Sequence, residues 1–203
     1  EELLQLIEDN IDVLDETALL RAATLVKENA QKIEIYKKAA EKYESAVAKY
    51  NMGVVYVYMN EIDKAAAILK GLEMDADWNN VMGVIALHKG QLEAAKNYFN
   101  KAGNQTAKEN LAVLDILAGE YEAAAAKLAG VEGYNAALAQ LLVGNNAPAA
   151  ALECQCPQAA YLRAVAAARQ GNAEAVKTNL EAAGKCEKLA ERAAKDVEFA
   201  QYR

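Results

Sequence analysis

The chain has 203 residues, of which 25% are charged and 54% are apolar, and its formal net charge at pH 7 is −7. A chain of this composition folds rather than stays disordered, and its negative charge argues against a nucleic-acid partner. Its longest apolar stretches, such as Met52 to Met59, are far shorter than the ~20 residues that cross a bilayer, so we expect no direct membrane insertion.

The first 44 residues predict three helices that do not follow the repeat of the later sequence. Residues Glu1 to Glu8 form a short helix in this prediction. A second helix runs from Asp15 to about Glu28, and its antiparallel partner extends from Gln31 to Tyr43. Residues 1–44 are therefore predicted to be divergent N-terminal helices, the last two of which make a degenerate hairpin.

Residues 45–184 contain about five copies of a short helical repeat. Every copy has a small residue inside its first apolar segment: Gly53, Gly83, Ala112, Ala137 and Ala164. Seven residues later comes a residue that favours a turn: Asn60, Gly90, Gly119, Gly144 and Gly171. Five residues further on lies a small or β-branched residue: Ala65, Ala95, Ala124, Ala149 and Val176. The turn residues follow one another at intervals of 30, 29, 25 and 27 residues.

This spacing predicts two antiparallel helices in each copy, one before the turn residue and one after it. The small residue in the first helix lets the second helix approach closely. Glycine or asparagine at the turn can adopt the left-handed conformation that ends a helix. The repeat therefore predicts a stack of antiparallel helical hairpins.

The end of the chain predicts a helix that covers the last hairpin. Residues Glu187 to Tyr202 carry an apolar face made of Leu189, Ala193, Val197 and Ala200. Stacked repeats need such a capping helix, because the terminal hairpin otherwise exposes an apolar side. The whole chain, residues 1–203, is therefore predicted to be a single all-α domain.

The repeat resembles the tetratricopeptide repeat (TPR). The resemblance is carried by Tyr50-Asn51-Met52-Gly53 with Tyr56, by Gly83 with Gly90, Ala95, Phe99 and Ala102, and by Gly119-Glu120-Tyr121-Glu122-Ala123-Ala124. The copies are shorter than the ~34 residues of the family and lack its closing proline, and Pro148 distorts the fourth turn. The resemblance implies an α-solenoid, a right-handed superhelical stack of hairpins that binds other proteins.

Three further stretches resemble a second family. They are Glu2-Leu3-Leu4-Gln5-Leu6-Ile7 with Thr17 to Thr24, Tyr134 to Leu142, and Ala194 to Ala200. Together they are similar to the C-terminal TPR region of Bacteroidales cell-envelope proteins, in which the repeat follows an OmpA-like domain. The resemblance implies a periplasmic or outer-membrane-associated location, and it implies no activity for the repeat itself.

In stacks of this kind the first helices of the hairpins line an inner, concave wall. We expect this wall to receive the residues one and four positions after each small residue, and the tyrosines three positions before it. These residues are predicted to form an apolar groove for a protein or peptide partner: Tyr50, Val54, Val57, Val84, Leu87, Val113, Ile116, Tyr134, Leu138 and Tyr161.

Two alternatives explain the same apolar positions. In the first, the short repeats close the stack, and these side chains are buried as core, as the rarity of exposed apolar patches on monomers would favour. In the second, two copies of the chain associate through the groove. In both alternatives the groove is already filled, so that it cannot bind a different protein.

The polar residues of the first helices narrow the kind of partner. TPR proteins that hold a terminal carboxylate use lysine, arginine and asparagine on the inner wall, where this chain has Tyr50 and Val54, so this partner class is disfavoured. Asparagines recur two residues before the small residue, at Asn51, Asn110 and Asn135. They could bond a ligand backbone, but a bond to the neighbouring helix is the favoured interpretation.

Three cysteines lie around the last hairpin. Cys156 precedes its first helix and Cys186 follows its second, so antiparallel packing brings the two together and predicts a Cys156–Cys186 disulfide. Cys154 is the alternative partner, and three reduced thiols are the other alternative. The bond would close a loop of about 30 residues, add ~3 kcal/mol, and form only in an oxidising compartment. No metal site is expected, because three thiols with no histidine nearby are an incomplete ligand set.

Nothing in the sequence predicts catalysis. His88 is the only histidine, and His88-Lys89-Gly90 offers neither a nucleophile nor an orienting carboxylate. No catalytic triad, paired carboxylate motif or Gly-rich phosphate loop is present. We therefore expect no enzymatic activity and no cofactor, and we expect Trp78 to pack between repeats.

These observations predict a non-catalytic protein–protein interaction scaffold that is part of a larger cell-envelope protein. The alternative is a structural or oligomerisation module whose groove is filled by its own chain or by a second copy.

Overall fold

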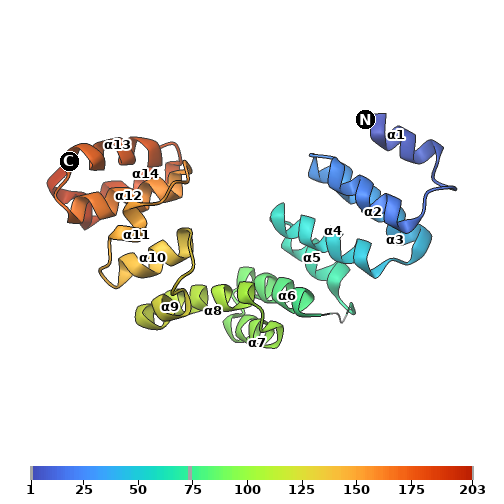
Figure 1. The fold of residues 1–203 in the computed structure, drawn as a ribbon, viewed down its shortest axis with the longest axis horizontal. Coiled ribbons are helices and arrows are strands. Elements are labelled where there is room, and N and C mark those ends of the chain that lie inside the picture. The colour runs from blue at the N-terminus through green and yellow to red at the C-terminus, as the bar shows by residue number, and fades with distance from the viewer. Residues whose placement is uncertain (1, 73–74, 203) are drawn as a thin grey trace. The chain divides into compact units, whose positions relative to one another are not determined.

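A computed structural model describes residues 2–72 and 75–202 of the protein. Within these residues every regular element is a helix, and successive helices form antiparallel hairpins, which confirms the predicted all-α, TPR-like fold (Figure 1). The chain divides into two compact units, Glu1–Ala107 and Lys108–Arg203. The prediction that residues 1–203 form one domain stays a prediction. None of the described helices has the length and apolar character needed to cross a membrane.

Unit 1 is built from a short leading helix and three hairpins. Its helices are α1 (Glu2–Asp9), α2 (Glu16–Leu25), α3 (Asn29–Tyr43), α4 (Ala46–Tyr58), α5 (Ile62–Leu69), α6 (Ala76–His88) and α7 (Leu92–Ala102). Helix α1 buries Ile7 in a cluster with Leu19, Ala23 and Ile35, so the leading helix packs on the α2–α3 hairpin. Helices α4 with α5 and α6 with α7 form the next two hairpins.

Unit 2 contains the remaining helices. They are α8 (Gln105–Ala118), whose first turn spans the boundary between the units, α9 (Tyr121–Lys127), α10 (Tyr134–Leu142), α11 (Ala147–Ala150), α12 (Pro157–Arg169), α13 (Ala173–Ala183), α14 (Glu187–Lys195) and the 3-10 helix η1 (Val197–Tyr202). Helix α11 has only four residues and contains Pro148. The shortened hairpin lies where the sequence predicts a distorted turn.

The five predicted turn residues all adopt the left-handed conformation. Their φ angles lie between +59° and +90° at Asn60, Gly90, Gly119, Gly144 and Gly171. Asparagine and glycine are the residues that tolerate this conformation, so the turn positions can be read directly from the sequence. The residues five positions later, from Ala65 to Val176, are all buried.

The small residues of the first helices set how closely each hairpin closes. A Cβ atom added to Gly53 would lie 2.5 Å from Cγ of Leu69, and one added to Gly83 would lie 2.4 Å from Cε1 of Phe99. Leu69 and Phe99 are themselves fully buried. The missing side chain therefore makes the space that a large residue of the second helix fills. In unit 2 the buried alanines Ala112, Ala137 and Ala164 take the same positions.

The predicted capping helix is wrong in one respect, because it is broken at Asp196. Helix α14 ends at Lys195, Asp196 is extended, and its carboxylate accepts a hydrogen bond from the Glu198 amide at 3.0 Å. This turn changes which side chains face the hairpin. Leu189 and Ala193 pack on the core as predicted, whereas Val197 is 84% exposed and Phe199 is buried in its place.

Replacing Asp75 with alanine should weaken the start of helix α6. Its Oδ1 atom accepts hydrogen bonds from the amides of Asp77 (3.1 Å) and Trp78 (3.2 Å), which would otherwise lack helical partners. We expect Asp75→Ala to lower the free energy of unfolding by about 1 kcal/mol, measured by urea unfolding followed by circular dichroism. Asp75→Ser should retain most of the stability, and equal losses in both variants would contradict a capping role.

Candidate functional site

Five of the ten predicted partner-binding residues lie on α4 and α6 of unit 1. Tyr50 and Val57 pack against the cluster around Leu69 and Trp78, and all five keep part of their surface exposed. We call the set Tyr50, Val54, Val57, Val84 and Leu87 the unit 1 face. It is therefore neither closed core nor a fully exposed patch.

Charged and aromatic groups border the unit 1 face. Burial raises the pKa of Tyr50 above its ordinary value, and the nearby carboxylates of Asp77 and Asp75 raise it further. These carboxylates lie at the start of α6, so Tyr50 is close to the next hairpin. Tyr58, at the end of α4, is 82% exposed. The face thus combines apolar side chains with tyrosines and an acidic edge.

The other five predicted residues lie in unit 2 and differ in their surroundings. Val113 and Ile116 are partly exposed on α8, and Ile116 packs against the cluster around Ala124 and Leu128. Tyr134, on α10, is exposed, and Leu138 packs against the core cluster of α12. Burial raises the pKa of Tyr134, and the charge of Arg192 opposes this shift.

Tyr161 is buried beneath the chain's own end, residues Asp196–Tyr202, which we call the C-terminal segment. Its hydroxyl donates a hydrogen bond to the Asp196 carboxylate, and its ring packs edge-on to Phe199 at 5.7 Å between ring centroids. Burial, followed by the hydrogen bond and charge of Asp196, raises the pKa of Tyr161 far above its ordinary value. The guanidinium of Arg192 lies 5.3 Å from the ring centre.

Arg169 holds the same segment by its charge. Its Nε and Nη2 atoms donate to Oε1 of Glu198 at 2.9 and 2.7 Å, and its Nη1 donates to the Leu141 carbonyl at 2.7 Å. The Tyr202 hydroxyl donates to the Ala168 carbonyl at 2.9 Å. Two acidic and two aromatic side chains of the C-terminal segment therefore anchor it to the first helix of the last hairpin.

Sequence reasoning overlooked this role of Arg169 and of the C-terminal segment. Arg169 stands five residues after the small residue Ala164, the register in which Tyr58 follows Gly53. An arginine in that register, together with Asp196 and Glu198 just before the aromatic residue Phe199, is the signal that could have found it. The break at Asp196 hid it, because a continuous helix would have turned Phe199 elsewhere.

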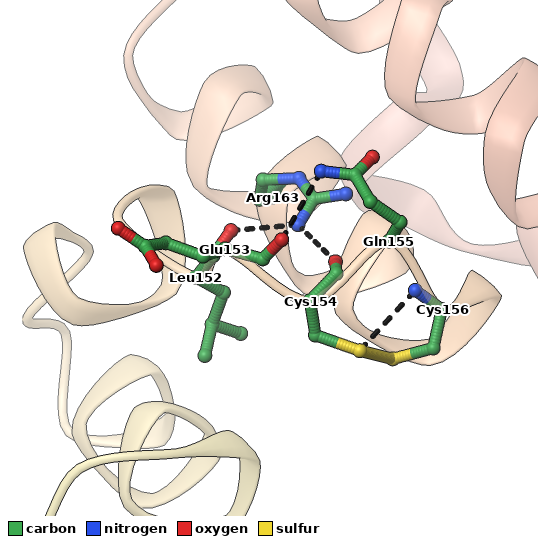
Figure 2. Close-up of a disulfide and its surroundings, with 6 residues drawn as sticks. All are labelled: Leu152, Glu153, Cys154, Gln155, Cys156 and Arg163. Carbon is green, nitrogen blue, oxygen red and sulfur yellow. Dashed lines mark hydrogen bonds between the residues drawn. A yellow bond between two sulfur atoms is a disulfide. The ribbon is translucent and has the colours of Figure 1, made fainter.

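The predicted Cys156–Cys186 disulfide is also wrong. Cys156 is bonded to Cys154, with a Cα–Cα distance of 5.4 Å (Figure 2). Cys186 is a free thiol at the start of α14. One intervening residue already brings Cys154 within the range a disulfide spans. The closed loop is very short, so the entropic stabilisation expected for a 30-residue loop does not apply.

Arg163 fixes the loop that carries this disulfide. Its Nη1 atom donates to the carbonyls of Leu152 (2.7 Å) and Cys154 (2.8 Å), and its Nε donates to Asn179 on α13 at 2.9 Å. Figure 2 shows the guanidinium lying between the two carbonyls. The loop before α12 is therefore tied to both helices of the last hairpin.

The remaining single residues lie close to their predicted places. His88 is exposed in the last turn of α6. Trp78 is buried, its indole N–H donates to the Leu69 carbonyl of the preceding hairpin at 3.3 Å, and its ring packs edge-on to Tyr98. This confirms Trp78 as a packing residue between repeats.

The comparisons agree with this architecture. No protein-family model matches the sequence, and no curated protein matches it either. Among solved structures, a tetratricopeptide repeat protein from Parabacteroides merdae aligns with a TM-score of 0.69 at 16% identity, covering 93% of this chain and 87% of that one. The APC/C Cut9–Hcn1 hetero-tetramer aligns with a TM-score of 0.73 at 10% identity.

The match to the Cut9–Hcn1 structure covers 100% of this chain but only 45% of the matched chain. Identities this low establish the fold and leave the partner open. The chain is therefore a TPR-like α-solenoid by fold.

Proposed function

We propose that the chain is a non-catalytic protein–protein interaction scaffold whose unit 1 face binds an extended peptide of a partner protein. We place it in the periplasm or at the outer membrane, on its resemblance to the envelope family. The Cys154–Cys156 disulfide supports an oxidising compartment.

The proposal rests on how the C-terminal segment packs against the last hairpin. In the last hairpin, the residues that correspond to the predicted groove are Tyr161, Val165 and Ala168, and all three are buried with Phe199 in one cluster. A short peptide segment therefore already lies on these positions in one hairpin. The equivalent positions of unit 1 stay partly exposed, and we propose that a partner's peptide covers them in the same manner.

The test compares two glutamate substitutions in the same hairpin. Val84→Glu places a charge on the unit 1 face, and Leu92→Glu places one on an exposed apolar residue of the second helix. We expect the native chain and Leu92→Glu to capture the same envelope protein in a crosslinked pull-down, and Val84→Glu to lose it. Thermal melting should show that both variants stay folded.

Two results would contradict the proposal. Equal capture by all three proteins would place the partner elsewhere on the molecule. A Val84→Glu variant that unfolds, or that changes its mass in solution, would instead support the alternative of a structural or oligomerisation module.

A further inference from the structure

Unit 1 contains a cavity of about 230 Å³ between the helices α2, α3 and α4, lined by both polar and apolar side chains. Helix α3 contributes Asn29, Lys32 and Tyr36 to its wall, and α4 contributes Asn51. Val54 of the unit 1 face and the exposed Tyr58 line the same cavity. The cavity therefore opens beside the surface on which we place the partner peptide.

Tyr36 gives this cavity a hydroxyl group at the end of an otherwise buried side chain. The residue is 7% exposed, and burial raises its pKa above the ordinary value. Within the described chain no residue makes a hydrogen bond to its hydroxyl. No described side-chain oxygen is both sealed from solvent and unpartnered, so this hydroxyl is reached from the cavity. The hydroxyl is therefore free to donate to, or accept from, a group that enters the cavity.

Lys32 places a positive charge in the wall of the cavity. Lys37 and Lys38, on the same helix, pair with Glu41 and Glu8, whereas Lys32 forms no ion pair with any described residue. None of the described residues that line the cavity carries a carboxylate. The wall thus offers an ammonium, a phenol and two amides as hydrogen-bond donors. Its single positive charge suits an acceptor that carries one negative charge, such as a carboxylate.

The last hairpin shows how this chain binds carboxylates of its own C-terminal segment. There a cation, Arg169, holds Glu198, and a tyrosine hydroxyl, that of Tyr161, holds Asp196. Lys32 and Tyr36 likewise offer a cation and a tyrosine hydroxyl, and neither binds a side chain of the described residues. The positive charge of Lys32 lies on α3, the second helix of its hairpin. The residues Tyr50 and Val54 on the first helix α4 therefore gave no indication of a carboxylate site.

We propose that this cavity binds the side-chain carboxylate of an aspartate or glutamate in the partner peptide. The source of the carboxylate rests on the proposed function, whereas binding of the carboxylate itself rests only on the cavity. The charge of Lys32 and the hydroxyl of Tyr36 hold the two oxygens, and the amides of Asn29 and Asn51 complete the set.

The experiment titrates isotope-labelled protein with two small probes and follows amide resonances by NMR. The first probe is N-acetyl-aspartate α-amide, whose only charge is the side-chain carboxylate, and the second is N-acetyl-asparagine α-amide. We expect saturable shifts at Asn29 and Asn51 with the first probe only. Lys32→Met should weaken binding about tenfold, and Tyr36→Phe about fivefold. Lys37→Met, on the exposed side of α3, should leave the affinity unchanged.

Equal shifts with both probes, no saturable shift, or native affinity in Lys32→Met would overturn the proposal. Because Tyr36→Phe keeps the buried ring, its fold should survive, and thermal melting checks this. The two proposals fail separately. If the aspartate probe binds but capture does not depend on Val84, the cavity site stands and the peptide-binding function is contradicted. If capture depends on Val84 but the aspartate probe does not bind, the peptide-binding function stands and the cavity site is contradicted.

Discussion

Phe199→Ala should release the C-terminal segment and lower the free energy of unfolding of unit 2 by about 3–5 kcal/mol. Phe199 is 1% exposed and packs in the core cluster of α12 against Tyr161. Its removal would leave a cavity that the short 3-10 helix cannot refill. Denaturant unfolding followed by circular dichroism measures the loss, and hydrogen exchange at α12 locates it.

Val197→Ala is the matched control for this prediction. It removes an apolar side chain from the same turn, but Val197 is 84% exposed. We expect a change within about 0.5 kcal/mol, because surface substitutions without partners have small effects. Similar losses of unfolding free energy in the two variants would mean that Phe199 does not anchor the C-terminal segment.

Gly83→Ala should destabilise unit 1 by about 1–3 kcal/mol, although alanine is the better helix former by about 1 kcal/mol. The steric clash outweighs the gain in helix propensity, because the new methyl group would lie 2.4 Å from the ring of Phe99. Phe99 is fully buried and cannot move aside. Urea unfolding of the variant gives the measurement.

A double variant distinguishes a local clash from a general effect on the helix. Gly83→Ala and Phe99→Leu should be coupled, with the second change costing less in the presence of the first. Additive losses would show that the two residues do not compete for the same space. A net gain of stability in Gly83→Ala alone would contradict the close approach of α6 and α7.

Most of the fold follows from signals that are local in sequence. Asn60 and Gly171 end their helices because few residues adopt a left-handed conformation, and Gly53 or Ala164 marks a close approach because nothing larger fits. Such requirements act within one hairpin and repeat in each copy. For this reason the hairpin stack could be predicted without knowledge of any long-range contact.

Most of the parts that the sequence did not predict depend on contacts between distant residues. Phe199 can pack on Tyr161 only because the chain turns at Asp196. The hydrogen bond from the Glu198 amide to the Asp196 carboxylate stabilises this turn at the end of α14. The Cys154–Cys156 bond is the exception, because it joins near neighbours, whereas the predicted pairing joined the two ends of the last hairpin. The Lys32–Tyr36 cavity lies between three helices, and both residues belong to the second helix α3, so the pattern of first helices alone could not indicate it.

The seating of the C-terminal segment also determines where this protein can tolerate mutation. Helix α12 contacts α10, α11, α13, α14 and η1, and most of its residues, six of them alanines, are buried. A helix enclosed on every side has no surface on which a larger side chain could be accommodated. Sequence drift during evolution should therefore be slowest along α12 and faster at the exposed positions of the second helices, where packing does not constrain the side chain.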